Sequence, residues 1–340
     1  MLGAVLKQTS RPLELMQLQT SSLKEGQVLV QVSYSGLCHT QLNEIFGLKG
    51  EDKFLPHTLG HEGSGIVLEV GDGVTKVKKG DHVVLTWLKG SGFDVPSTQY
   101  QSKEGTVNSG AISTFLEHAV VSENRVIPIP KEMPLREAAL LGCALPTGAG
   151  VVKNEMNLQK GNSFALFGCG GVGLSALLCA VQRGAHPVIA VDVNEAKLQR
   201  ALQLGATHIV DARQDPVSQI KQICGGVDFA FESAGRREAM EAAFGSLKAP
   251  GLCILAGNLP KGEKISIDPF DLICGKQIRG TWGGKSSIDE DVKMYAELFL
   301  KGELRLSELI THEVPLQEIN SLVDKLQQGQ VGRGLIVINV

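Results

Sequence analysis

The sequence predicts an α/β protein made of a β-rich unit and a doubly wound parallel sheet. Three observations lead to this prediction. Short β-type runs separated by Gly, Pro and Asp turns occupy the chain up to about residue 145. Apolar strand candidates then alternate with helical stretches from about residue 147 to 285. A glycine-rich loop lies between a strand and a helix at the start of this second part.

Length and composition are those of an ordinary globular protein. The 340 residues are enough to bury a core in each of two domains. Only 20% of the residues are charged and the formal net charge is −3, which provides no basic surface for a nucleic acid and no charged tail. We therefore expect no nucleic-acid partner.

Cysteine usage predicts a reducing compartment. The seven cysteines are odd in number, include no CxxC pair and follow a start, "MLGAVLKQTSRPLEL", that lacks the features of a signal peptide. We therefore expect a cytoplasmic protein. The uncharged run "FALFGCGGVGLSALLCAV", residues 164–181, is long enough to span a bilayer. Its glycine pattern and the strands that follow favour a buried strand, turn and helix, so no membrane partner is expected.

The first part of the chain is predicted to be mainly antiparallel. Its clearest strand candidates are "GQVLVQVSYSG", "GSGIVLEVGDG" and "GDHVVLTW", each bounded by turn residues. The segment after residue 285 returns to mixed helix and strand and includes "GLIVINV".

The second part contains six apolar strand candidates, which are "SFALFG", "PVIAVD", "THIVD", "VDFAFE", "GLCILAG" and "QIRGTW". Helical stretches such as "EAKLQRALQLG" and "REAMEAAFGSL" lie between them. Strands joined by helices form a parallel sheet with helices on its faces.

The loop "FALFGCGGVGLSALL" predicts a dinucleotide site. Gly168, Gly170 and Gly173 have GxGxxG spacing, which permits a tight turn, a close approach of pyrophosphate and close packing of helix on strand. The next strand ends in Asp192, where a carboxylate accepts hydrogen bonds from the adenosine ribose and repels a 2′-phosphate. NAD is therefore favoured over NADP. The alternative is a sheet of the same kind that binds no dinucleotide.

Several residues of metal-ligand type occur in the β-rich part: Cys38, His39, His57, His61, Glu62 and Cys143. Neighbours in an extended segment point to opposite sides, so Cys38 and His39 are not expected to bind one ion. Two thiolates and one imidazole, with the fourth tetrahedral position open, make a catalytic zinc site. By spacing alone, simpler roles stay open: Cys143 as a core residue, and His61 bonded to a backbone carbonyl.

Six motifs together resemble one protein family. They are "GLCHTQL", "GHEGSGIVLEVGDGVTKVKKGDHVV", "LLGCALPTGAG", "GCGGVGLSALL", "VDVNEAKLQRALQLGAT" and "GGVDFAFESAG". The chain resembles, essentially from end to end, the zinc-containing alcohol dehydrogenases of the medium-chain dehydrogenase/reductase superfamily. The resemblance implies a GroES-like catalytic domain at 1–146, completed by 286–340, and a Rossmann domain at 147–285. It also implies a homodimer or homotetramer.

The resemblance implies a role for each matching position. One catalytic zinc would be held by Cys38, His61 and Cys143, with Glu62 as a buried acid near it. Thr40 would bond the substrate oxygen and begin a proton relay, and Trp87 would line the substrate pocket. The cofactor would contact the loop and ribose residues together with flanking positions: His39, Thr147, Gly168, Gly170, Gly171, Val172, Gly173, Asp192, Lys197 and Arg333.

Three departures from the family pattern limit this assignment. Asn43 stands where the relay commonly has a histidine, and an amide is no base near neutral pH. Gln41 stands where an aspartate commonly orients the zinc-bound histidine, a change that makes the zinc more electrophilic. The lobe at 88–115, which commonly holds a structural zinc on four cysteines, contains none, so no structural zinc is expected.

The expected activity is hydride transfer between a small-molecule alcohol or aldehyde and NAD, with zinc as Lewis acid. Two alternatives remain at this stage. One is an NADPH-dependent carbonyl or enal reductase on the same fold, suggested by the missing relay histidine. The other is a non-catalytic cofactor-binding protein, which the joint presence of all three ligands and Thr40 disfavours.

Overall fold

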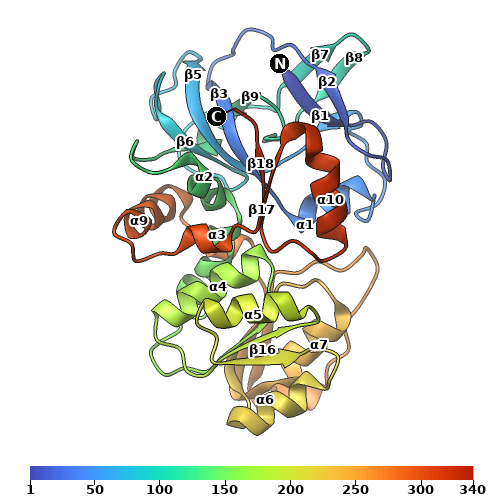
Figure 1. The fold of residues 1–340 in the computed structure, drawn as a ribbon, viewed down its shortest axis with the longest axis vertical. Helices are drawn as coiled ribbons and strands as arrows, with labels where there is room; N and C mark the ends of the chain where they lie inside the picture. Colours follow the sequence, from blue (N-terminus) through green and yellow to red (C-terminus); the bar gives the residue numbers. More distant parts are fainter. Residues whose placement is uncertain (340) are drawn as a thin grey trace. The chain divides into compact units, whose positions relative to one another are not determined.

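The computed structural model describes residues 1–339 and divides the chain into two compact units (Figure 1). Unit 1 comprises Met1–Cys143 and Ser287–Val340, and unit 2 comprises Ala144–Ser286. The predicted domain ranges, 1–146 with 286–340 and 147–285, stay a prediction, because compactness describes packing and not independent folding.

Unit 1 contains a seven-stranded sheet in which β3 (Gln27–Leu37) is central. The order is β10-β6-β5-β3-β18-β17, and β9 also pairs with β3. All pairs are antiparallel except β17 with β18. The other strands are β5 (Glu62–Val70), β6 (His82–Thr86), β9 (His118–Ser122), β10 (Val126–Pro128), β17 (His312–Pro315) and β18 (Gly334–Val337).

A second sheet of unit 1 has five strands in the order β2-β1-β4-β8-β7. They are β1 (Leu2–Leu6), β2 (Glu14–Gln17), β4 (His57–Thr58), β7 (Gln99–Ser102) and β8 (Gly105–Asn108). The helices of unit 1 are α1 (His39–Ile45), α2 (Leu135–Ala138), α9 (Ile288–Leu300) and α10 (Ile319–Gln327). The apolar residues of α10 recur at helical spacing and enter the core that α1 also joins: Ile319, Leu322, Val323 and Leu326.

Unit 2 is a six-stranded, wholly parallel sheet, which confirms the predicted fold class. Its order is β13-β12-β11-β14-β15-β16. Each predicted strand candidate overlaps one of these strands, although β15 and β16 begin before their candidates: β11 (Phe164–Phe167), β12 (Val188–Asp192), β13 (His208–Asp211), β14 (Val227–Glu232), β15 (Leu247–Leu255) and β16 (Lys276–Gly280). Its helices are α3 (Ala144–Gly150), α4 (Gly171–Gln182), α5 (Glu195–Gln203), α6 (Pro216–Cys224), α7 (Arg237–Gly245) and α8 (Pro269–Ile273).

The uncharged run 164–181 forms the predicted strand, turn and helix, with β11 fully buried and α4 largely so. Within residues 1–339, no single helix combines the length and apolar composition needed to cross a bilayer. One bent pair, Leu135–Gly142 with Ala144–Glu155, meets those criteria by length and composition.

The cysteine-free lobe at 88–115 is held by a buried carboxylate. Glu123, only 2% exposed, accepts hydrogen bonds from three backbone N–H groups: those of Thr75 (2.7 Å), Lys76 (2.8 Å) and Phe93 (2.9 Å). Burial opposes ionisation of Glu123, but these bonds outweigh it and lower its pKa. The carboxylate therefore joins the lobe to the segment that precedes β6.

A Glu123→Gln substitution should destabilise unit 1 by roughly 2–4 kcal/mol, because one carboxylate oxygen becomes an amide nitrogen that faces a backbone donor. The lowered pKa means that ionised Glu123 stabilises the folded state above its ordinary pKa of 4.5 and loses this effect as the pH falls through the folded value. The difference from wild type, measured by urea unfolding, should therefore be fully present at pH 7 and shrink only as the pH falls below 4.5. Glu104→Gln, on the exposed tip of the same lobe, is the control and should change stability by less than about 0.5 kcal/mol. Equal unfolding midpoints for wild type and Glu123→Gln would contradict this account.

Candidate functional site

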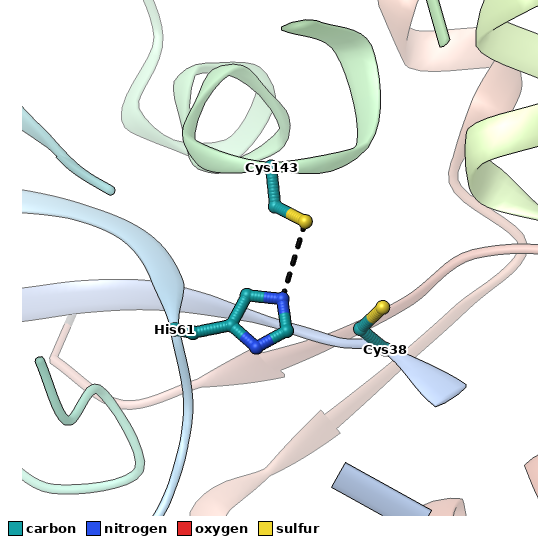
Figure 2. A group of neighbouring side chains, drawn as sticks. All are labelled: Cys38, His61 and Cys143. Carbon is teal, nitrogen blue, oxygen red and sulfur yellow. Dashed lines mark hydrogen bonds between the residues drawn. The ribbon is translucent and has the colours of Figure 1, made fainter. Parts of the chain in front are cut away.

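Three side chains of metal-ligand type converge within unit 1 (Figure 2). Cys38 follows the end of β3, His61 directly precedes β5, and Cys143 follows a 3₁₀-helix at Ala139–Gly142. One ligand atom from each lies within 4.8 Å of the other two, and His61 Nε2 is 3.2 Å from Cys143 Sγ. In the part of the chain that the structure describes, this is the one such group of three or more.

Cys38 and His39 are separated by a change of secondary structure. Cys38 is extended (φ −112°, ψ 154°) and caps α1, whereas His39 is the first residue of that helix and is exposed. The single extended segment expected through both residues is wrong, because a helix starts at His39. His57 is also outside the group: its Nε2 lies 2.8 Å from Asp52, and its Nδ1 contacts the Thr58 carbonyl.

Gln41 connects two of the three converging residues. Its Oε1 accepts the Cys38 N–H at 3.0 Å, and its Nε2 lies 2.5 Å from His61 Nδ1. The amide oxygen faces Cys38 because a backbone N–H needs an acceptor, so the amide nitrogen faces the ring. A neutral amide therefore orients His61 here in the place where the family commonly has a carboxylate.

The surroundings of Cys38 favour its thiolate. A hydrogen bond from the Cys143 thiol is the largest influence, burial opposes it, and His61 and Arg333 add to it, so the pKa of Cys38 lies well below its ordinary value. A thiolate is the form of cysteine that binds metals.

A buried ion pair lies beside these residues. Glu62, at the start of β5, pairs with Arg333, which precedes β18, and the two side chains are 0% and 3% exposed. Arg333 also donates to the Leu37 carbonyl at 3.3 Å. Gly36 of β3 lies against the pair, and a Cβ there would collide with both charged groups. The sequence analysis missed Gly36, although a glycine inside a strand pattern signals such a close approach.

Two further predicted site residues of unit 1, Thr40 and Trp87, lie next to members of this group. Thr40 and Asn43 lie on α1, and Thr40 Oγ1 is 3.9 Å from Cys38 Sγ. The Trp87 ring meets the His61 ring edge-on, with centroids 6.4 Å apart and planes at 68°.

The glycine-rich loop of unit 2 has the geometry of a phosphate cradle. Gly168 has a φ of +97°, and Ala234 fills the space where its Cβ would be. A Cβ at Gly170, by contrast, would meet no described atom within 4 Å. Helix α4 begins at Gly171 and continues through Val172 and Gly173. Its first N–H groups are those that a helix cannot pair internally, which favours an anion there.

Asp192 is the last residue of β12, the strand next to β11, and its carboxylate bonds the backbone of the glycine-rich loop. Its Oδ2 accepts the Cys169 N–H at 2.7 Å and its Oδ1 accepts the Asn194 N–H at 2.9 Å. Lys197 lies one turn into α5 and is partly exposed. Thr147 of α3 is 8% exposed, and its hydroxyl has no hydrogen-bond partner among residues 1–339.

Two family models match the chain. "Alcohol dehydrogenase GroES-like domain" matches residues 24–131, and "Zinc-binding dehydrogenase" matches residues 171–301. Two similar relatives are S-(hydroxymethyl)glutathione dehydrogenases. That of Synechocystis sp. is 33% identical over 98% of both chains, and that of Saccharomyces cerevisiae is 33% identical over 98% of this chain and 95% of its own.

Solved structures agree with these matches. An alcohol dehydrogenase zinc-binding domain protein from Burkholderia ambifaria has a TM-score of 0.92 and 32% identity, covering 100% of this chain and 99% of its own. Benzyl alcohol dehydrogenase from Acinetobacter calcoaceticus has a TM-score of 0.90 and 32% identity over 99% of both chains. The chain therefore belongs to the zinc-containing alcohol dehydrogenases of the medium-chain dehydrogenase/reductase superfamily and is an alcohol oxidoreductase.

Proposed function

We propose that this enzyme interconverts a small-molecule alcohol and its aldehyde with NAD, using one zinc ion held by Cys38, His61 and Cys143. The observation that carries the proposal is the convergence of these three ligand atoms within 4.8 Å. Two sulfurs and one imidazole nitrogen suit tetrahedral zinc and leave its fourth position for substrate. When bound, zinc supplies Lewis-acid polarisation of the substrate oxygen.

The neighbouring side chains support this ligand set. The environment of Cys38 already favours the thiolate. His61 would bind through Nε2, which requires the ring proton on Nδ1 and therefore an oxygen acceptor beside that atom. In the structure the Gln41 oxygen faces the Cys38 N–H, so metal binding through Nε2 would require the amide to turn and present its oxygen to Nδ1, at the expense of its bond to Cys38.

Thr40 is the proposed first acceptor of the substrate proton. It lies on the first turn of α1, beside Cys38, and a hydroxyl can accept one proton while donating another. Asn43, one turn further along α1, cannot act as a base near neutral pH. The proton would therefore leave Thr40 for water or for a cofactor hydroxyl.

NAD is proposed over NADP because of Asp192. Each carboxylate oxygen of Asp192 accepts one backbone N–H, and a carboxylate has about four lone-pair sites, so acceptor capacity remains for ribose hydroxyls. The negative charge would repel a 2′-phosphate. Lys197 is the second proposed ribose contact.

The other proposed cofactor contacts follow the family pattern. Gly168, Gly170, Gly171 and Gly173 would bind the pyrophosphate, while Thr147 and Val172 would pack against the nicotinamide. A contact between Gly148 and the Val172 carbonyl brings α3 against α4 and supports this pairing. His39 and Arg333, in unit 1, are the proposed pyrophosphate contacts from the catalytic unit.

Trp87 is the proposed wall of the substrate pocket, because its ring lies edge-on to His61. Glu62 would act through Arg333 and the zinc ligands, since it is fully buried beside them. The relatives named for S-(hydroxymethyl)glutathione and benzyl alcohol suggest alcohols of quite different size as first substrates to assay.

We propose a homodimer or homotetramer in the cytoplasm. Strand β16 is an edge strand of the unit 2 sheet, and Phe270 (64%), Ile273 (80%) and Trp282 (80%) beside it in sequence are exposed. An edge strand with exposed apolar neighbours is a pairing surface. All seven cysteines lie within residues 1–339 and none forms a disulfide, which supports a reducing compartment.

The first experiment measures metal and turnover together. Purified enzyme should hold roughly one zinc per chain, and Cys38→Ser, His61→Ala and Cys143→Ser should each lose both zinc and alcohol-dependent NADH formation. Cys274→Ser, which changes an exposed cysteine outside the group, should retain both. Two zinc ions per chain would contradict the expectation that the cysteine-free lobe at 88–115 holds no structural zinc. Faster NADPH consumption with a conjugated enal than NADH formation with any alcohol would favour the reductase alternative.

The cofactor assignment is tested at Asp192. Asp192→Ala should shift the NAD to NADP ratio of kcat/KM toward NADP by about 1–3 kcal/mol, through lost charge-assisted hydrogen bonds and lost repulsion. Asp228→Asn is the control. Asp228 lies near the amino end of β14, and this substitution should leave the ratio unchanged. An unchanged ratio in Asp192→Ala would remove the basis for preferring NAD.

The assembly proposal predicts that Ile273→Asp dissociates the oligomer, since a charge would be buried in an apolar interface. Light scattering after gel filtration should give the monomer mass for this variant. Phe54→Asp, an equally drastic change at a side chain 72% exposed in unit 1, should keep the wild-type mass. A monomeric wild-type enzyme would refute the proposal outright.

A further inference from the structure

Glu232, the last residue of β14, is a buried carboxyl group at the carboxyl end of the unit 2 sheet. It is 0% exposed and pairs in register with Phe167 of β11 and Leu255 of β15. The proposed activity gives it no role. Ligands of doubly wound sheets bind at this end of the strands, so a buried ionisable group there requires an explanation.

One oxygen of Glu232 organises the turn that follows it. Oε1 accepts the Ala234 N–H at 2.8 Å and the Gly235 N–H at 2.7 Å. The other oxygen, Oε2, is buried and has no hydrogen-bond partner among the described residues. Burial raises the pKa of Glu232 to about 7, against the opposing effect of nearby backbone N–H groups.

The turn that Glu232 holds lies directly behind the glycine-rich loop. The Ser233 hydroxyl donates to the Gly168 carbonyl at 2.9 Å, and the Ser233 N–H donates to the Phe167 carbonyl at 2.8 Å. Ala234 is so close to Gly168 that a Cβ on the glycine would be 2.7–2.9 Å from its backbone and side chain. The same turn therefore limits where Gly168 can lie.

The loop after β15 closes the other side of the turn. The N–H groups of Ala256 and Gly257 donate to the Glu232 backbone carbonyl, and a Cβ at Gly257 would be 2.5 Å from Glu232 Oε2. Glu232 thus lies where the chain leaves β11, β14 and β15, and its side chain bonds the turn after β14.

We propose that Glu232 is a positioning residue for the dinucleotide site. Its side chain holds the turn 233–235, and this turn packs against the glycine-rich loop. The inference rests on the proposed function, since it takes that loop to be the cofactor site. Without an acceptor at Oε1, two N–H groups of the turn would lose their partner and the turn would relax away from Gly168. The loop would then reach its binding geometry in only a fraction of molecules, and NAD affinity would fall by that fraction.

The test is direct NAD binding to zinc-loaded enzyme by titration calorimetry. Glu232→Ala should raise the NAD Kd about tenfold or more, which corresponds to losing roughly one well-formed buried hydrogen-bond partner. Glu232→Gln keeps an acceptor oxygen of the same reach and should rescue most of the loss. Glu232→Asp, one methylene shorter, should fall between Ala and Gln.

Two further measurements separate positioning from a general loss of stability. Ile220→Ala, at the buried residue of α6 in the core of unit 2, should lower the melting temperature while keeping the wild-type NAD Kd. In Glu232→Ala, KM for NAD should rise while kcat at saturating NAD and zinc content stay at wild-type levels. Amide exchange at Ala234 and Gly235 should be faster in the free variant.

The outcomes distinguish the inference from the proposed function. Wild-type enzyme that fails to bind NAD would overturn the cofactor proposal itself. Wild-type enzyme that binds NAD, together with a Glu232→Ala variant of equal affinity, would overturn only the role of Glu232. Failure of Glu232→Gln to restore the NAD affinity would overturn that role as well. If Glu232→Ala does not fold, the NAD Kd values of Glu232→Gln and Glu232→Asp are compared: a higher Kd for Glu232→Asp is expected, and equal values would overturn the role.

Discussion

The buried ion pair between Glu62 and Arg333 is the constraint on which the catalytic unit depends. A buried pair stabilises a fold only when both partners are held in place, and losing one of them leaves an uncompensated charge in the core. Glu62 is the neighbour of His61, and Arg333 reaches the Leu37 carbonyl next to Cys38. The pair therefore links β5 to β18 across β3, next to Cys38 and His61, which are two of the three converging residues. Gly36 leaves the space that both charged groups occupy.

Unit 2 uses the same principle with weaker interactions. There, a carboxyl group at the end of a strand bonds the backbone of the next turn, and glycines allow three loops to approach one another. In both units a buried acid lies beside residues that are proposed to bind a ligand. Such an arrangement holds a reactive surface in place with groups that do not themselves react, which is what precise positioning of a site requires.

Residue patterns predicted the parts of this enzyme that depend on local chemistry. The six strands of unit 2 and the turn at Gly168 follow from periodicity and glycine spacing, so they could be read directly. The convergence of Cys38, His61 and Cys143 required the family resemblance, because the three residues lie on separate segments. Gln41 was read only as a lost carboxylate, since its contacts with Cys38 and His61 depend on how α1 starts. Glu123 and Glu232 escaped notice because both bond backbone N–H groups, which leave no trace in the sequence.

The absence of cysteines from the lobe at 88–115 affects what oxidation or metal loss can damage in this enzyme. Its attachment consists of a carboxylate and backbone amides, and no thiolate is present in that stretch to be oxidised or to lose a metal. Oxidation or metal loss at the proposed ligands Cys38 and Cys143 would therefore leave the attachment of the lobe intact. Chemical damage at the proposed zinc site would then remove activity without removing the contacts that hold this lobe to the rest of unit 1.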